Sequence, residues 1–387
     1  MSVACKIFML LLIFVQYTLG MAQDTVRSTH DSLIFSGQLT GWAHYNQLNS
    51  LPVYLGGRYI PQLNYQIKMP NERMIDFEGS ANIVGTAGFK PFDTLHYEGD
   101  VTPYRLWARY STKQSEIRLG LQKINFGSAT LLRPLMWFDQ LDPRDPQQLT
   151  SGTWGLLGRY YFLNNTNIWL WGLYGNKQQR PWDIGDTYKN QPEFGGRIQT
   201  PAPKGEAALS YHFREVDMTA FGIMPPLPQK IAENRVGFDA KFDLVVGLWT
   251  EASWINKSKN VGLLTNQEMI NLGTDYTFKL GNGLNVIYEH LLFASDEQAF
   301  AFSNTFSFSA LSLSYPLSID DNINVISFFD WKNKASYNFI NIKHQFKYFS
   351  LFLMPYYNPE KYHLPQQGTT GAQFAGKGVQ LMIIYNH

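Results

Sequence analysis

Acidic and basic side chains crowd into one segment between residues 126 and 152. The charged members of interest are Arg133, Asp139, Asp142, Arg144 and Asp145. The three aspartates are spaced by three, whereas calcium loops place their first oxygen ligands at alternate positions and turn on a glycine. This segment has prolines instead, so a calcium site is only weakly indicated. Acids and arginines that face each other across water would select ions and dipolar solutes.

Further charged side chains occupy alternate positions of segments that we interpret as strands. They are Arg105, Arg109, Arg118, Arg159, Arg235, Glu251 and Glu289. A basic side chain that faces lipid near the middle of a bilayer costs about 2–4 kcal/mol, so these residues are expected to face the inside of a barrel. There they would either line and constrict a pore or form salt bridges that fill the lumen. With the five residues above, they are the predicted pore-lining or constriction residues.

Catalytic motifs are missing from the sequence. The 8 histidines are scattered, and neither G-x-S-x-G nor H-E-x-x-H occurs. His212 near Ser210 and His290 beside Glu289 are each explained by strand alternation. The single cysteine, Cys5, precedes the first apolar stretch, so disulfides and thiolate metal sites are not expected. The sequence predicts no enzyme, no cofactor and no metal site.

The elements that must position the charged residues alternate with a period of two. One face of each is apolar and the other polar, as in residues 33–46, 74–87, 233–243 and 268–280. These stretches run for 11 to 14 residues. Ordinary sheets have strands of about 5 or 6 residues, whereas a tilted membrane-crossing strand needs about 9 to 11. Their length favours a barrel in lipid over a soluble, secreted β-rich protein, which is the alternative fold.

Eighteen segments show this alternation. Because some are expected to be split or to lie in the lumen, we predict an all-β, transmembrane antiparallel β-barrel of about 16 strands, within a range of 14 to 18. Outer-membrane barrels usually have even strand numbers. Leu280–Gly283 is expected to form a tight periplasmic turn. Residues 176–193, 215–230 and 358–375 are expected to form extracellular loops.

The segment 126–152 breaks the alternation. Pro134, Pro143 and Pro146 exclude a regular central strand. The segment is also rich in leucine and aromatic residues, which a fully solvated loop would rarely expose. We expect it to fold inward and narrow the pore, and the alternative is an extracellular lid packed on its neighbours.

The start of the chain resembles a secretory signal. Lys6 is followed by an apolar stretch at residues 7–15, and small residues precede a predicted cleavage site between Ala22 and Gln23. The stretch is too short to cross a bilayer, which needs about 20 residues. The predicted organisation is a signal peptide at 1–22, a short polar lead at 23–31 and an outer-membrane β-barrel at 32–387.

Composition restricts the class further. The formal net charge is +1, so no basic excess points to nucleic acid. Beyond the signal, no apolar run approaches 18 residues, and no transmembrane helix is predicted. Aromatic residues make up 15% of the chain, which suits the aromatic girdles of barrels at the two membrane interfaces.

The run from Arg118 to Phe162 resembles porin-like outer-membrane barrels, including the alginate-export-like group. In that group a strand ending R-x-G-x-Q-x-x-x-x-G continues into a loop that contains Pro and Asp. The matching positions are Arg118, Gly120, Gln122 and Gly127. The phrase GLWTE at 247–251 also looks like a recurrent barrel-strand phrase. The resemblance covers about a tenth of the chain and implies the fold rather than the solute.

These observations predict an outer-membrane porin-like channel for passive passage of small solutes or ions. One alternative is a substrate-specific transporter, of an acidic polysaccharide if the lumen is cationic, or of a hydrophobic compound if Trp42, Trp107 and Trp249 line an apolar tunnel. Another is a plugged structural or assembly barrel. An energy-coupled receptor would need a plug domain and more strands. The expected partners are outer-membrane lipid and small solutes or ions, without nucleic acid, and a homo-oligomer is compatible with the sequence.

Overall fold

The structure is a computed structural model. It describes residues 31–90, 93–176, 179–188, 190–219, 230–361, 364 and 373–387. The predicted signal peptide and all but the last residue of the predicted polar lead lie outside the described residues. Within the described part, no helix is long and apolar enough to cross a membrane.

The described residues form nineteen strands. Their bounds are β1 Ser32–Asn46, β2 Val53–Met69, β3 Arg73–Phe89, β4 Leu95–Ser111, β5 Ser115–Gln122, β6 Thr153–Tyr161, β7 Asn167–Leu173, β8 Asp186–Thr187, β9 Glu193–Ala202, β10 Gly205–Asp217, β11 Ile231–Asp243, β12 Gly247–Lys257, β13 Asn266–Phe278, β14 Leu284–Asp296, β15 Thr305–Pro316, β16 Asp321–Asp330, β17 Ala335–Gln345, β18 Phe349–Tyr357 and β19 Lys377–Asn386.

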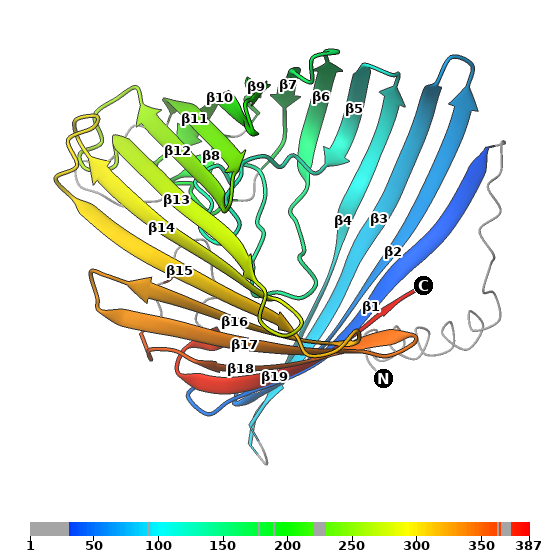
Figure 1. The fold of residues 1–387 in the computed structure, drawn as a ribbon, viewed down its shortest axis with the longest axis vertical. Helices are drawn as coiled ribbons and strands as arrows, with labels where there is room; N and C mark the ends of the chain where they lie inside the picture. The colour runs from blue at the N-terminus through cyan, green and yellow to red at the C-terminus, as the bar shows by residue number, and fades with distance from the viewer. Residues whose placement is uncertain are drawn as a thin grey trace.

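All of these strands except β8 form one closed antiparallel barrel (Figure 1). Each pairs with its neighbours along the chain, and β1 closes the ring on β19. β7 pairs directly with β9, and β8 pairs only with the end of β10, so β8 is not a member of the ring. The ring has 18 strands, and the predicted number of about 16 is wrong. The sequence reasoning discounted segments as split or lumenal, yet even short β5 and β7 are paired on both sides.

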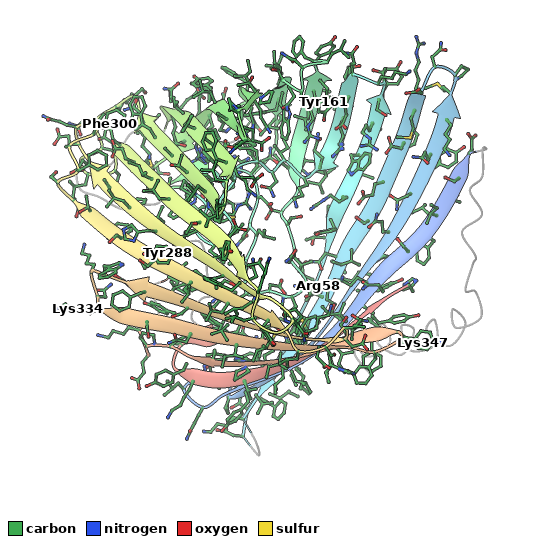
Figure 2. All side chains as sticks on the ribbon, in the orientation of Figure 1. Arg58, Tyr161, Tyr288, Phe300, Lys334 and Lys347 are labelled. Atoms are coloured by element: carbon green, nitrogen blue, oxygen red, sulfur yellow. The ribbon has the colours of Figure 1, made fainter. Side chains whose placement is uncertain are left out.

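Alternation along each strand separates the outer surface from the lumen. On β10, Leu209 and Tyr211 are exposed on the outside, while the alternating residues Ser210 and His212 are buried on the inside. Exposed apolar side chains recur in this way around the wall, and Figure 2 shows side chains on both of its faces. An apolar outer face and a polar inner face are typical of a barrel in lipid.

The two ends of the barrel differ in their connections. Leu280–Gly283 forms a tight turn between β13 and β14, in which the Gly283 amide donates to the Leu280 carbonyl at 2.9 Å. Lys347 marks the turn between β17 and β18 at the same end, whereas Phe300 and Lys334 lie in connections at the other end (Figure 2). The longest connections leave from that second end.

The connection between β5 and β6, residues 123–152, lies inside the barrel (Figure 1). We call it the inward loop. Leu132, Met136, Trp137 and Phe138 of this loop are each at most 2% exposed. The apolar side chains of the loop pack in two buried clusters against inward-facing residues of the wall. The segment therefore folds inward, as expected, and does not form the extracellular lid that was the alternative.

A second segment, residues 179–188 between β7 and β9, also packs inside. Trp182 is buried and its indole donates to the carbonyl of Arg133 in the inward loop at 2.7 Å. This differs from the expected extracellular loop at 176–193, because the segment carries a tryptophan and charged groups that find buried partners. Of the other expected loops, residues 220–229, 362–363 and 365–372 lie outside the described residues.

Candidate functional site

A carboxylate on β14 fixes the inward loop to the barrel wall. Glu289 accepts hydrogen bonds from the backbone amides of Thr130 at 2.7 Å, Leu131 at 3.1 Å and Leu132 at 2.6 Å. It also accepts from Trp249 and Asn271 on neighbouring strands. A carboxylate that collects several amide donors satisfies backbone groups that burial would otherwise leave unpaired. Glu289 thus anchors the loop.

Glu251 on β12 forms a second anchor. It accepts from the amides of Ala129 at 2.7 Å and Leu135 at 3.2 Å. Gly127 approaches the same carboxylate with a φ of +102°, and a Cβ atom there would lie 2.2 Å from Oε1 of Glu251. The loop therefore needs glycine at this position for both its conformation and its space.

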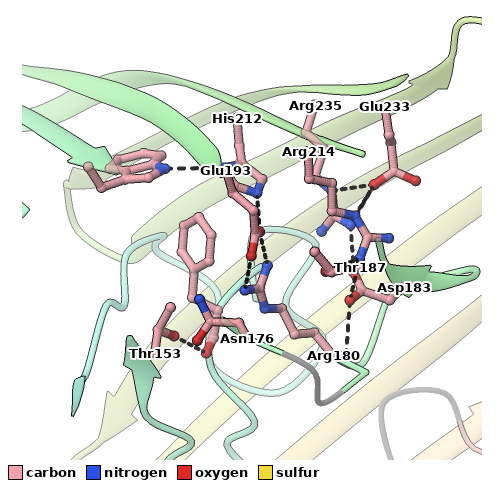
Figure 3. Close-up of polar contacts among 12 residues, drawn as sticks. Thr153, Asn176, Arg180, Asp183, Thr187, Glu193, His212, Arg214, Glu233 and Arg235 are labelled. Atoms are coloured by element: carbon pink, nitrogen blue, oxygen red, sulfur yellow. Dashed lines mark hydrogen bonds and ion pairs between the residues drawn. The ribbon is translucent and has the colours of Figure 1, made fainter. Parts of the chain in front are cut away.

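A buried ion cluster holds the second segment (Figure 3). Its members are Arg180, Asp183, Glu193, His212, Arg214, Glu233, Arg235 and Lys257. Asp183 pairs with Arg214 at 2.9 Å and with Arg235 at 2.5 Å. Burial alone would raise the pKa of Asp183, but these two guanidinium groups hold it below its usual value. The cluster is enclosed and has a structural role, because it ties the segment to β10 and β11.

A third set of charges faces the lumen on β3 to β6. Arg109 pairs with Asp76 at 2.6 Å, and Glu116 joins Arg109, Arg118 and Arg159 at 3.0 to 3.4 Å. These side chains keep 10% to 24% of their surface exposed, unlike the ion cluster. They form a ladder of ion pairs along one side of the lumen.

A cavity of about 790 Å³ remains beside the inward loop. Its lining comes from the loop itself, from the second segment, from β1 to β6 and from β16 to β19. Asp139, Asp142, Arg144 and Asp145 all lie on it. Asp142 pairs with Arg144 at 2.5 Å, and the Arg144 guanidinium also lies over Phe339. The part of the inward loop from Asp139 to Asp145 thus borders the cavity.

Burial affects two of the acids on this cavity. It raises the pKa of Asp139, and Lys123 and Arg133 oppose the shift only in part. It raises the pKa of Asp145 in the same way. Both carboxyls therefore take up a proton at a higher pH than an exposed aspartate does.

The structure divides the predicted charged residues into three groups. Asp139, Asp142, Arg144 and Asp145 line the cavity, and Arg109, Arg118 and Arg159 form the ladder. Arg235, Glu251 and Glu289 are completely buried and hold the inserted segments. Arg133 and Arg105 are also buried, bonded respectively to the Phe126 carbonyl at 3.2 Å and the Thr150 carbonyl at 3.1 Å.

Sequence reasoning missed Arg58 on the cavity and Asp183 in the ion cluster. Arg58 occupies an inward position of β2, and its Nη1 donates to Gln147 at 2.8 Å. Strand alternation predicts that the Arg58 side chain points into the lumen, but it does not identify Gln147 as its hydrogen-bond partner. Asp183 sits in a segment with no strand pattern, so nothing in the sequence indicated burial. Among the described residues, no group of three or more His, Cys, Asp or Glu side chains is placed to hold a metal ion.

Comparisons with known proteins find the fold but no sequence family. No family model and no curated protein matches the chain. OccK7 of Pseudomonas aeruginosa is similar with a TM-score of 0.56 at 10% identity, covering 93% of this chain and 99% of that one. OccAB4 of Acinetobacter baumannii gives 0.54 at 10% identity over 93% and 99%. OmpF of Salmonella typhi, in complex with daunomycin, gives 0.51 at 11% identity over 92% and 97%.

The chain therefore has the fold of outer-membrane porin barrels. Its apolar outer surface fits a location in the outer membrane. The resemblance to the alginate-export-like group in particular is not shown by these comparisons.

Proposed function

We propose that the chain is an outer-membrane channel through which small solutes or ions pass passively, and that the inward loop narrows its lumen. The observation that carries the proposal is the division of the lumen. Glu251 and Glu289 hold the loop against β12 to β14, while a cavity of about 790 Å³ with charged lining stays open on the opposite side. A loop fixed in this way defines a constriction whose charges act on passing ions.

The proposal includes export by the predicted signal peptide at 1–22 and insertion of the barrel into lipid. The closed ring supports insertion, because every wall strand is paired on both sides and no edge is left in the bilayer. A homo-oligomer remains a prediction.

We do not propose catalysis. His212 is completely buried between Glu193 and Trp171, at 3.1 Å and 3.2 Å, and is enclosed by the packed half of the lumen. A plugged structural barrel is the second candidate, and the buried clusters around the inward loop favour it.

Single-channel recording separates the two candidates. The purified chain, shown to be folded by its heat-modifiable mobility on gels, would be reconstituted in planar bilayers. We expect stepwise conductance whose selectivity shifts toward anions when Asp139, Asp142 and Asp145 are changed to asparagine. Asp93→Asn, an exposed acid in the connection between β3 and β4, is the control and should leave selectivity unchanged. A folded barrel without conductance would refute the channel and leave the plugged barrel.

A further inference from the structure

The ion cluster that holds the second segment does not balance its own charge. It contains four cations and three carboxylates, a net charge of +1 when His212 is counted as neutral. The cations are Arg180, Arg214, Arg235 and Lys257, and the carboxylates are those of Asp183, Glu193 and Glu233. None of these side chains is more than 7% exposed. The barrel therefore encloses one positive charge that the cluster does not compensate.

The neighbouring acids are engaged elsewhere. Asp239, the next inward acid along β11, pairs with Arg197 at 2.5 Å. Glu251 on β12 accepts from amides of the inward loop. Outside the described residues, the sequence has one acid, Asp24, near the start of the chain, so the connections around the barrel add no further carboxylate. The missing negative charge must come from something other than a side chain of the surrounding segments.

Two of the buried cations also keep unused donors. Arg235 directs Nε and Nη2 at Glu233 and Asp183, whereas its Nη1 forms no hydrogen bond within the described residues. The ammonium of Lys257 lies 3.3 Å from Oε2 of Glu233, which can take at most one of its three donors. Buried charged donors without acceptors are costly. These donors indicate an acceptor that the protein itself does not provide.

The unused donors come from adjacent positions of the wall (Figure 3). Glu233 on β11 lies in register with Arg214 on β10 and with Lys257 on β12. Arg235 is two residues further along the same face of β11, so it is a diagonal neighbour of Lys257. Diagonal neighbours in antiparallel strands lie about 7–8 Å apart, which long side chains span. One small ion placed between them would contact both.

We propose that the ion cluster binds one small monovalent inorganic anion, of the size of chloride, between Arg235 and Lys257. The ion would supply the missing charge and accept from the unused donors, whereas a water molecule would satisfy the donors and leave the buried charge uncompensated. Val216 and Ile231, the adjoining inward residues of β10 and β11, are buried in apolar packing. The space beside the cluster therefore suits an ion rather than an organic molecule.

This site is distinct from the cavity of the proposed channel. Of the described residues that line the cavity, none is Arg235 or Lys257. The anion would be held as part of the packed interior and would act on the stability of the barrel. The inference therefore goes beyond the proposed function and does not depend on conductance.

Thermal unfolding of the purified barrel reports on the ion. In nonionic detergent at neutral pH, the unfolding midpoint would be followed by tryptophan fluorescence while sodium chloride or sodium bromide replaces sodium gluconate at constant ionic strength. Gluconate is too large for the site. An ion that binds only the folded chain raises the midpoint as its concentration increases, and we expect a rise of about 2 °C over a roughly hundredfold increase in halide.

Lys257→Met removes the excess charge and retains a side chain of similar length. We expect this variant to lose the halide dependence and to be at least as stable as the wild type in gluconate, because the remaining cations and carboxylates balance. Lys259→Met, which changes an exposed lysine in the connection after β12, is the matched control and should keep the wild-type dependence.

Two results would overturn the inference. A wild-type midpoint that ignores halide would mean that the excess charge is absent or is only hydrated, and a halide response that persists in Lys257→Met would place the ion elsewhere. If Lys257→Met does not fold, anomalous scattering from wild-type crystals grown in bromide decides. A bromide peak within hydrogen-bond distance of Arg235 Nη1 and Lys257 Nζ supports the site, and its absence there refutes it.

Discussion

Gly127 is the residue on which the path of the inward loop depends most directly. Its φ of +102° is unfavourable for a side-chain-bearing residue, and a Cβ atom would collide with Glu251. We expect Gly127→Ala to displace the loop from its anchor and to lower the temperature at which the barrel loses its folded mobility on gels, since a strained backbone of this kind costs about 1–3 kcal/mol.

Gly79→Ala is the control for this substitution. Gly79 lies on β3 with nothing within 4 Å of an added Cβ atom, and its backbone is that of a regular strand. An equal loss of stability in both variants would contradict the role given to Gly127.

We expect Asp139 and Asp145 to make the proposed channel sensitive to mild acid. Burial raises the pKa of both carboxyls in the folded chain, so they become neutral at a higher pH than ordinary aspartates. We expect cation preference, read from the reversal potential in a salt gradient, to fall as the pH is lowered from 7 through this range. The double change to asparagine should remove that part of the pH dependence, and persistence of the full dependence would contradict the assignment.

The same shift has a consequence for stability. The folded chain binds these two protons more tightly than the unfolded chain does. Their contribution to the free energy of unfolding is therefore present at low pH and is lost as the pH rises through the raised pKa. At neutral pH the ionised pair is a local cost, which the anchors of the loop must offset.

The second inserted segment depends on the ion cluster. Removing one partner from a buried ionic group leaves the others uncompensated and costs about 3–5 kcal/mol. We expect Asp183→Asn to expose residues 179–188 to protease added to the folded barrel, because Arg214 and Arg235 then lose a shared carboxylate. Asp186→Asn is the matched control, since Asp186 is exposed in the same segment. Equal protection of both variants would show that apolar packing around Trp182 suffices.

Strand alternation made most of the wall predictable from the sequence. Leu209 and Tyr211 against Ser210 and His212 show why, since a period of two assigns each side chain to lipid or lumen. The strand number was underestimated because some of the eighteen alternating segments were expected to be split or to lie in the lumen, whereas even the short β5 and β7 are paired on both sides.

The inserted segments were predictable only in part. Prolines and a high apolar content marked 126–152 as a packed, irregular segment. Its anchors were not recognisable, because Glu289 lies 159 residues beyond Thr130 and resembles any inward strand residue. Residues 179–188 were misjudged for the same reason, since the groups that bury Asp183 come from β10 and β11.

On the scale of the whole molecule, the lumen is divided between packed segments and an open cavity. The inward loop packs against β6, β7 and β12 to β18, and the ion cluster ties the second segment to β9, β10 and β11. The cavity lies between the loop, the second segment, β16 to β19 and β1 to β6. This division is what a narrowed channel requires, and it depends on the carboxylates that hold the loop to one side.

The most direct test compares the single-channel conductance of the wild type with that of a double variant, Glu251→Gln with Glu289→Gln. Glu206→Gln, an exposed acid on β10, serves as control. We expect stepwise conductance in the wild type and the control, and a larger, less steady conductance once the loop is released from β12 and β14. A folded double variant with unchanged conductance would contradict the claim that the inward loop forms the constriction.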